Sequence, residues 1–323
     1  MMRKLASGFL AVALLSAGCK EKNGDGGEVD VIRGAIPRAG EVEIKLPNSA
    51  AARRTELGDG LGASQYAVIG ETAEMYQLTR GISVSLNLGA AFVLGLARTI
   101  VTFPVTSMEG ATYVWGPWTD SLNPSEWRMT VTPTAAGEFD WKLEGRKKAD
   151  GAGAPWRATV SGLADPGLLP GTGTGSFTMD FVTAEELDPA GNSGEGVIAV
   201  TYDFAGAVKS IAIDADNGDE TVSYSYGESV ADGTGNFQFI VRGDTEDEGP
   251  LAELIEIRSR WLGTGAGRSD FRISSGDMGE VVVTGSECWD TAFARSYYTD
   301  SFPIAPTEGE AASCAFADVS LPE

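Results

Sequence analysis

Apolar and polar residues alternate with a period of two along most of the chain from residue 111 onward. Such alternation is typical of β-strands that have one buried and one solvated face. The predicted buried positions are Trp127, Met129 and Val131; Phe139, Trp141 and Leu143; Trp156, Ala158 and Val160; Phe177, Met179 and Phe181; Val222, Tyr224 and Tyr226; Phe237, Phe239 and Val241; Ile255, Ile257 and Trp261; Phe271 and Ile273. No helical pattern separates these segments, so they predict an antiparallel meander.

Turn residues separate the predicted strands, notably Asn217-Gly218 and the glycine-rich stretch 263–267. Asn-Gly favours a two-residue type I′ hairpin. So many strands do not stay in one flat sheet, and we expect a curved sheet, a half-barrel or a barrel. A membrane pore is disfavoured, because the polar faces carry charged residues that are costly against lipid.

One segment breaks the β pattern. Apolar residues recur at spacings of three and four from Met75 to Phe103, and Pro104 follows. This stripe predicts a helix over about residues 71–103, lying against or inside the sheet, with Leu86 and Val93 fully buried. The uncharged part of the segment is shorter than the roughly 20 residues that a transmembrane helix needs. The predicted fold class is therefore mainly β (α+β), an antiparallel meander packed on one long helix.

The N-terminus has the pattern of an export signal. Arg3 and Lys4 precede an apolar run, and small residues then lead to Cys19. The sequence Leu15-Ser-Ala-Gly-Cys19 resembles the lipobox of bacterial lipoproteins, although the leucine stands one place further from the cysteine than is usual. The resemblance, which covers only the first twenty or so residues, implies that Cys19 becomes the first mature residue and carries acyl chains. Lys20 in place of an aspartate then favours the outer membrane over the inner one.

These observations divide the chain into three parts. Residues 1–18 form the predicted signal peptide, and residues 19–47 a tether that is too polar and glycine-rich to fold by itself. Residues 48–323 form a single β-rich domain. In an exported chain the two other cysteines, Cys288 and Cys314, are expected to form a disulfide. A redox pair or metal site is disfavoured there, since the chain has no CxxC spacing and no histidine.

Composition narrows the classes of function. The chain has 323 residues and a formal net charge of −22, so phosphate backbones repel it and nucleic acid is not an expected partner. Without histidine it has no Ser-His-Asp triad and no imidazole ligand for zinc. It also lacks the G-x-S-x-G motif and a Ser-x-x-Lys signature. We therefore expect no enzyme activity and no cofactor, although paired carboxylates suited to hydrolysis could lie among the 46 acidic residues.

Two groups of residues are weak candidates for binding. Asp214, Asp216 and Glu220 alternate as calcium ligands do, but the glycine does not stand where an EF-hand loop requires it, and a plain hairpin is favoured. The aromatic cluster of Trp115, Trp118 and Trp127 could line an apolar pocket or stack on a sugar, or could simply belong to the core.

The sequence thus predicts a lipid-anchored protein of the cell envelope that binds without catalysis, either an apolar ligand or an envelope protein. The inferred architecture resembles bacterial lipoprotein-carrier proteins at the level of fold alone, and fold does not imply function. A structural envelope protein without a ligand is the alternative, and a carboxylate-based hydrolase is less favoured. Membrane attachment through Cys19 is the one partner relationship that a motif supports.

Overall fold

The computed structural model describes residue 36 and residues 68–134, 137–167, 172–192, 194–244, 251–302, 307–319 and 321. For residues 88–93 only the backbone is described. The described residues include nothing of the predicted signal peptide and only Ile36 of the predicted tether, so Cys19 lies outside them.

The described residues form an antiparallel meander in which fifteen strands follow one another in sequence order, from β1 to β15. Strand order begins at β1 and ends at β15, so the meander is not closed into a barrel. Of the expected alternatives, the closed barrel was therefore wrong. A strand order of this kind needs only short connections between neighbours, which the turn residues of the sequence provide.

The described chain falls into two compact units, which are considered in turn. Unit 1 contains residues 89–206 and 214–218 together with Ile36, and unit 2 contains residues 68–88, 207–213 and 219–321. Helix α2, Glu74–Thr102, contributes to both units, and so does strand β8, Val208–Asp216.

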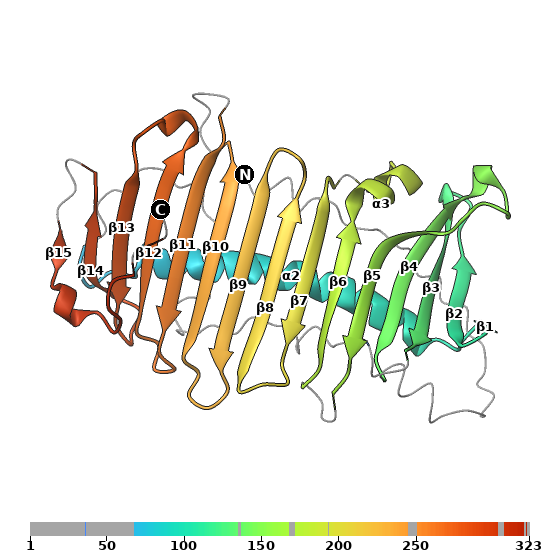
Figure 1. Cartoon of the computed structure of the whole chain (residues 1–323), viewed down its shortest axis with the longest axis horizontal. Coiled ribbons are helices and arrows are strands. Elements are labelled where there is room, and N and C mark those ends of the chain that lie inside the picture. The colour runs from blue at the N-terminus through green and yellow to red at the C-terminus, as the bar shows by residue number, and fades with distance from the viewer. Residues whose placement is uncertain are drawn as a thin grey trace. The chain divides into compact units, whose positions relative to one another are not determined.

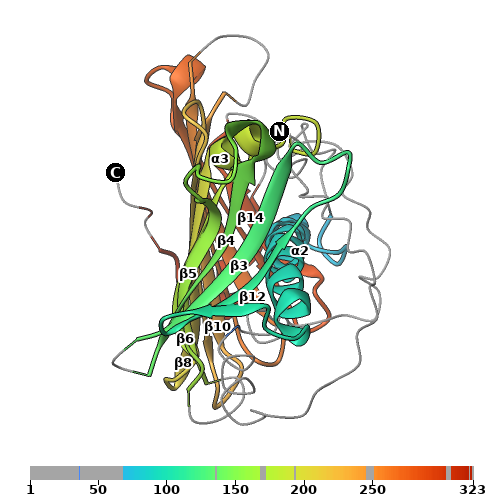
Figure 2. The same cartoon turned by 90° about the vertical axis from the view of Figure 1, so that its right-hand side faces the viewer.

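Unit 1 contains the first seven strands of the meander (Figures 1 and 2). They are β1 (Ser107–Glu109), β2 (Thr112–Trp118), β3 (Ser125–Pro133), β4 (Phe139–Lys147), β5 (Arg157–Asp165), β6 (Thr174–Asp180) and β7 (Val197–Asp203). The core of this unit contains residues that alternation predicted to be buried, namely Trp127, Met129 and Val131 on β3 and Trp141 and Leu143 on β4. Figure 2 shows the second half of α2 beside β3 on one side of the sheet.

Unit 2 contains the last seven strands. They are β9 (Thr221–Ser229), β10 (Gly235–Gly243), β11 (Glu253–Trp261), β12 (Gly267–Ser275), β13 (Val283–Trp289), β14 (Arg295–Asp300) and β15 (Glu308–Gly309). One face of these strands buries Tyr224, Phe237, Ile257 and Trp261. Short 3₁₀ turns, η3 (Lys148–Asp150) in unit 1 and η4 (Gly276–Met278) and η5 (Ala311–Ser313) in unit 2, lie between strands or beyond the last one.

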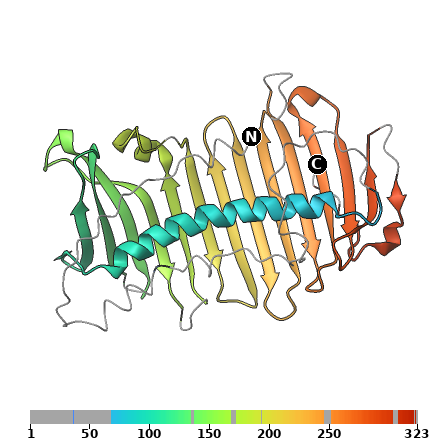
Figure 3. The same ribbon diagram turned by 180° about the vertical axis from the view of Figure 1, so that it is seen from behind.

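In unit 2 the first half of α2 crosses the strands on one side of the sheet, as Figure 3 shows from behind. Its contacts with the sheet are partly polar. The Thr79 hydroxyl lies 2.7 Å from the Ser259 hydroxyl of β11, which donates to Ser269 of β12 at 3.0 Å. The side that the helix buries here therefore carries Thr79 and Ser83, together with Ile82.

This pattern corrects one expectation. Leu86 was predicted to be fully buried, but it is only half-buried, while Val93 lies among the residues whose side chains are not described. The apolar stripe of the sequence misplaced the buried side because Thr79 and Ser83 face the sheet. Buried hydroxyls are tolerated when they are hydrogen-bonded, and the Ser83 hydroxyl donates to the carbonyl of Thr79 at 2.9 Å.

Two other departures lie in unit 1. A β-bulge between Leu143 and Glu144 shifts the register of β4 against β5. An extra residue on one strand reverses the side on which the following side chains lie. Trp156 was predicted to be buried in the core. It instead contacts the guanidinium groups of Arg128 and Arg146, on the face of the sheet opposite the core.

The second departure is a short helix, α3 (Phe181–Leu187), where Phe181 had been predicted to end a strand. Asp180 caps this helix, because its carboxylate accepts the backbone N–H of Thr183 at 2.8 Å. Leu187 is buried, and its carbonyl accepts the hydroxyl of Ser125 at 2.6 Å. The prediction that no helix interrupts the strands was therefore wrong at this point.

Candidate functional site

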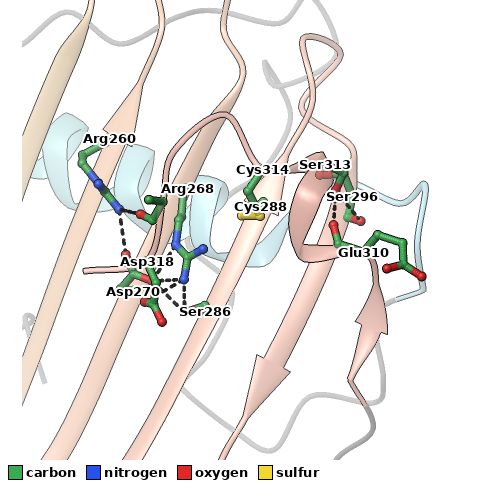
Figure 4. Close-up of a disulfide and its surroundings, with 11 residues drawn as sticks. Arg260, Arg268, Asp270, Ser286, Cys288, Ser296, Glu310, Ser313, Cys314 and Asp318 are labelled. Carbon is green, nitrogen blue, oxygen red and sulfur yellow. Dashed lines mark hydrogen bonds and ion pairs between the residues drawn. A yellow bond between two sulfur atoms is a disulfide. The ribbon is translucent and has the colours of Figure 1, made fainter. Parts of the chain in front are cut away.

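The predicted disulfide is confirmed. Cys288 of β13 is bonded to Cys314, which directly follows η5, and their Cα atoms are 5.4 Å apart. The Cys288 side chain is buried, and the bond fixes the C-terminal segment to the sheet of unit 2 (Figure 4).

The three tryptophans of the aromatic cluster lie in unit 1. Trp115 and Trp127 are each only 2% exposed, and Trp118 lies opposite Trp127 in the β2–β3 register. The Trp115 indole N–H donates to the carbonyl of Phe103 at 2.9 Å, so this ring ties the end of α2 to β2. Trp115 and Trp127 thus belong to the packed core of the unit.

The weak calcium candidates lie at a strand connection. Asp214 and Asp216 belong to β8, which ends at Asp216, and β9 begins at Thr221. The connection therefore has four residues, and the predicted two-residue turn was wrong. The Asp216 carboxylate accepts the backbone N–H of Gly218 at 2.8 Å, and Gly218 has a positive φ. Within the described residues, no group of three or more acidic or cysteine side chains is placed to hold a metal ion.

The most distinctive group of polar side chains lies elsewhere, on the face of unit 2 that points away from α2. Ser259, Ser269 and Glu287 lie on the side of the sheet that faces α2. Ser259 contacts Thr79 and donates to Ser269, and Glu287 accepts a backbone N–H at the start of the helix. Because side chains alternate along a strand, Arg260, Arg268, Ser286 and Cys288 point to the other side. The register brings Arg260 opposite Arg268, and Arg268 opposite Cys288. Two arginines and the disulfide thus form one row across three strands.

A buried aspartate holds this row together. The Asp270 carboxylate accepts the Nε–H of Arg268 at 2.8 Å, the hydroxyl of Ser286 at 2.6 Å and an Nη2–H of Arg260 at 3.1 Å. Arg268 is 4% exposed and Asp270 3% exposed. A buried charge pair persists only when further hydrogen bonds satisfy it, and these contacts do so.

The C-terminal segment covers the two arginines (Figure 4). The Arg260 guanidinium lies 5.2 Å from the ring centroid of Phe316 and donates to the carbonyl of Ala317 at 2.7 Å. Arg268 Nη2 donates to a carboxylate oxygen of Asp318 at 2.8 Å. Each arginine therefore bridges the sheet and the residues that follow the disulfide.

Burial lowers the pKa of Arg260, and the neighbouring Asp270 carboxylate opposes that effect. Arg268 and Arg258 lower the pKa further by like-charge repulsion. The guanidinium stays charged, since the ordinary pKa of arginine is far above neutrality. Three positive charges near one carboxylate attract a further anion, and Asp318 supplies one.

A second buried polar group lies at the start of α2. The Glu287 carboxylate is fully buried and accepts the backbone N–H groups of Glu74 and Met75, at 3.2 and 2.5 Å. Arg295 Nε also donates to this carboxylate, at 2.5 Å. Burial raises the pKa of Glu287, and Arg295 opposes this effect. The group caps the helix and has a structural role.

Sequence reasoning missed the arginine row and its cover. The arginines were predicted only to lie on the solvated faces of strands. Alternation shows on which face of the sheet a residue lies, but not which residues of the adjacent strands lie beside it. One signal was available: Arg258, Arg260, Arg268 and Arg272 crowd into two adjacent predicted strands of a strongly acidic chain.

The chain matches no protein-family model, no curated protein and no solved structure at a significant level. Among the described residues, no helix combines the length and apolar character that a membrane span requires.

Proposed function

We propose that this protein is a lipid-anchored protein of the cell envelope, held in the outer membrane through Cys19, that binds a protein partner without catalysis. The support for the anchor is the Leu15–Cys19 sequence and the polar tether that follows it. Two or more acyl chains hold a protein firmly on a membrane, whereas one chain alone does not.

The single observation that carries the partner-binding part is the hydrogen-bonded contact between α2 and the sheet in unit 2. A carrier of apolar ligands needs open space between helix and sheet. There, small buried side chains connect the two layers instead, with 2.7 Å between Thr79 and Ser259. We propose that α2 packs on the sheet along its whole length, which leaves the opposite face for recognition.

The chemistry of that opposite face also supports binding over catalysis. Its buried carboxylate, Asp270, already accepts hydrogen bonds from the guanidinium groups of Arg260 and Arg268 and from the hydroxyl of Ser286. A general acid or a nucleophile must be free to exchange a proton or attack a substrate. Asp270 is therefore suited to positioning the arginines, and a carboxylate-based hydrolase is not favoured here.

Site-specific photo-crosslinking in cells tests the proposal on the full-length lipidated protein. A photoreactive phenylalanine at Asn236, which lies opposite Arg260 on the outward face, should give a discrete adduct with one protein. The same residue at Glu185, an exposed position on α3 in unit 1, is the matched control and should give no such adduct.

Two results would contradict partner binding. Absence of adducts at Asn236, combined with saturable binding of an apolar fluorescent probe to the delipidated protein, would favour an apolar-ligand carrier. Absence of both would favour a structural envelope protein.

A further inference from the structure

The outward face of β10 to β12 concentrates positive charge in an acidic chain. Its arginines, called the arginine face below, are Arg242, Arg258, Arg260, Arg268 and Arg272. All five occupy the strand positions that point away from α2. The chain as a whole carries 46 acidic and 24 basic residues, so this grouping is a local reversal of its charge.

The C-terminal segment shows how a peptide binds this face. Residues Phe316-Ala317-Asp318 offer a ring to Arg260, a carbonyl to the same guanidinium and a carboxylate to Arg268. The side chain of Asp318 is 79% exposed, although the side chain of its partner Arg268 is buried. The buried arginine is thus built into the sheet, whereas its carboxylate ligand comes from the surface.

We infer that the arginine face is a docking site for an acidic peptide segment with an aromatic residue two places before an aspartate or glutamate, and that Phe316-Ala317-Asp318 is its resident occupant. The partner's segment replaces the resident one. This inference rests on the proposed function, since it names the chemistry of the protein partner.

Two features favour a peptide over a phosphate or a lipid headgroup. Arg260 binds a backbone carbonyl and an aromatic ring, and neither group is present in inorganic phosphate. Cation–π contacts and charge-assisted hydrogen bonds together recognise such a segment. A simple anion could accept hydrogen bonds from the arginines but would leave the ring contact of Arg260 unused.

The disulfide keeps the resident segment at high effective concentration. Cys314 is fixed to β13 only two residues before Phe316, and a short tether of this kind gives an effective concentration of the order of millimolar. An external segment must therefore outcompete it. Weakening the contacts of Phe316 and Asp318 should open the site while the disulfide and the sheet stay in place.

The test uses the full chain carrying Phe316→Ala and Asp318→Asn, with a fluorescent peptide of sequence AFADVSL as the probe. The double variant should bind the peptide at least tenfold more tightly than the unaltered chain does. A peptide with asparagine in place of aspartate should bind at least tenfold more weakly. Arg260→Gln in the double variant should also reduce binding, whereas the matched control Arg157→Gln, in unit 1, should not.

Three outcomes would overturn the inference. One is absence of peptide binding to the double variant, provided that proteolysis shows its C-terminal segment to be released. The second is equal binding of a scrambled peptide of the same charge. The third is preferential binding of vesicles containing anionic phospholipid, or full competition by inorganic phosphate, which would assign the face to a headgroup. Because these measurements use a purified protein and a synthetic probe, they fail independently of the crosslinking experiment.

Discussion

The carboxylate of Glu287 accepts the backbone N–H of Met75 at 2.5 Å, which joins β13 to the start of α2 across 212 residues of sequence. The first N–H groups of a helix have no partner within the helix, so a group elsewhere must satisfy them. Glu287 does this from the sheet and places a negative charge at the positive end of the helix. The contact determines where α2 begins on the sheet of unit 2.

Replacement of Glu287 by alanine is expected to destabilise the protein by about 3–5 kcal/mol, because it leaves the buried guanidinium of Arg295 without its closest carboxylate. Glu74 lies 3.7 Å from Arg295 and compensates only in part. Denaturant unfolding followed by tryptophan fluorescence measures the change. Glu74→Ala, at the half-buried end of the same cluster, is the matched control and should cost much less. Equal losses in the two variants would contradict the capping role.

The pH dependence of stability provides a separate prediction for Glu287. Burial raises the pKa of this acid in the folded state, so the folded state binds its proton more tightly than the unfolded state does. The contribution of Glu287 to stability should therefore be largest below the ordinary pKa of glutamate and fall as the pH rises from that value through the raised one. Above the raised pKa the contribution of Glu287 to the pH dependence should end.

Melting temperatures measured across this window should show the fall in the unaltered protein. Glu287→Gln cannot titrate, so its curve should lack that component while being lower overall, because an amide presents one acceptor where the carboxylate presents two. Parallel curves for the two proteins would refute the assignment.

The sequence predicted what local periodicity governs and missed what distant contacts decide. Alternation predicted strands β3 to β6 and β9 to β12, and in these strands Trp127, Tyr224 and Trp261 are in the core. Trp156 was misplaced because the bulge in the pairing of β4 with β5 reverses the side of the sheet on which this residue lies. A bulge leaves no periodic signal in the sequence. The arginine row depends on the register of three strands and on a segment about fifty residues further along the chain.

The helix illustrates the same limit. Its length followed from the three- and four-residue spacing, and α2 ends one residue before Phe103. The spacing did not predict which side of the helix is buried. Thr79 and Ser83 are polar but buried, because their hydroxyls form hydrogen bonds that hydropathy does not predict. Turn length was likewise misjudged at Asn217-Gly218, where the Asp216 side chain accepts a backbone N–H within a four-residue connection.

Removal of the disulfide should release the C-terminal segment more than it disturbs the sheet. Cys288→Ser with Cys314→Ser opens a loop whose closure stabilises a protein by about 3.5 kcal/mol in the chain-entropy model. We expect rapid proteolytic cleavage after residue 300 and little change in near-ultraviolet circular dichroism. Loss of the circular dichroism signal together with the cleavage would show that the bond supports the whole of unit 2.

Substitution of Cys19 tests whether lipid anchors the protein to the membrane. Cys19→Ala removes the sulfur that would carry the acyl chains, so the exported variant should move from the membrane fraction to the soluble fraction. Cys19→Ser is the matched control, since it differs from cysteine by one atom and also cannot form the thioether. A variant of either kind that stays with the membrane would exclude lipid on Cys19 as the anchor.

The polar contact between α2 and the sheet should contribute measurably to stability. Thr79→Val keeps the shape of the side chain but removes the hydroxyl that lies 2.7 Å from Ser259 and donates to the carbonyl of Met75. Ser259 retains its bond to Ser269, so the expected loss is about 1–2 kcal/mol rather than the larger cost of an orphaned group. Thr99→Val is a close control, because Thr99 makes the same bond to the carbonyl four residues earlier but is exposed. Its effect should stay within about 0.5 kcal/mol. If the two valine variants lose the same stability, the hydroxyl pair does not hold the helix on the sheet, and it would no longer count against an apolar-ligand carrier.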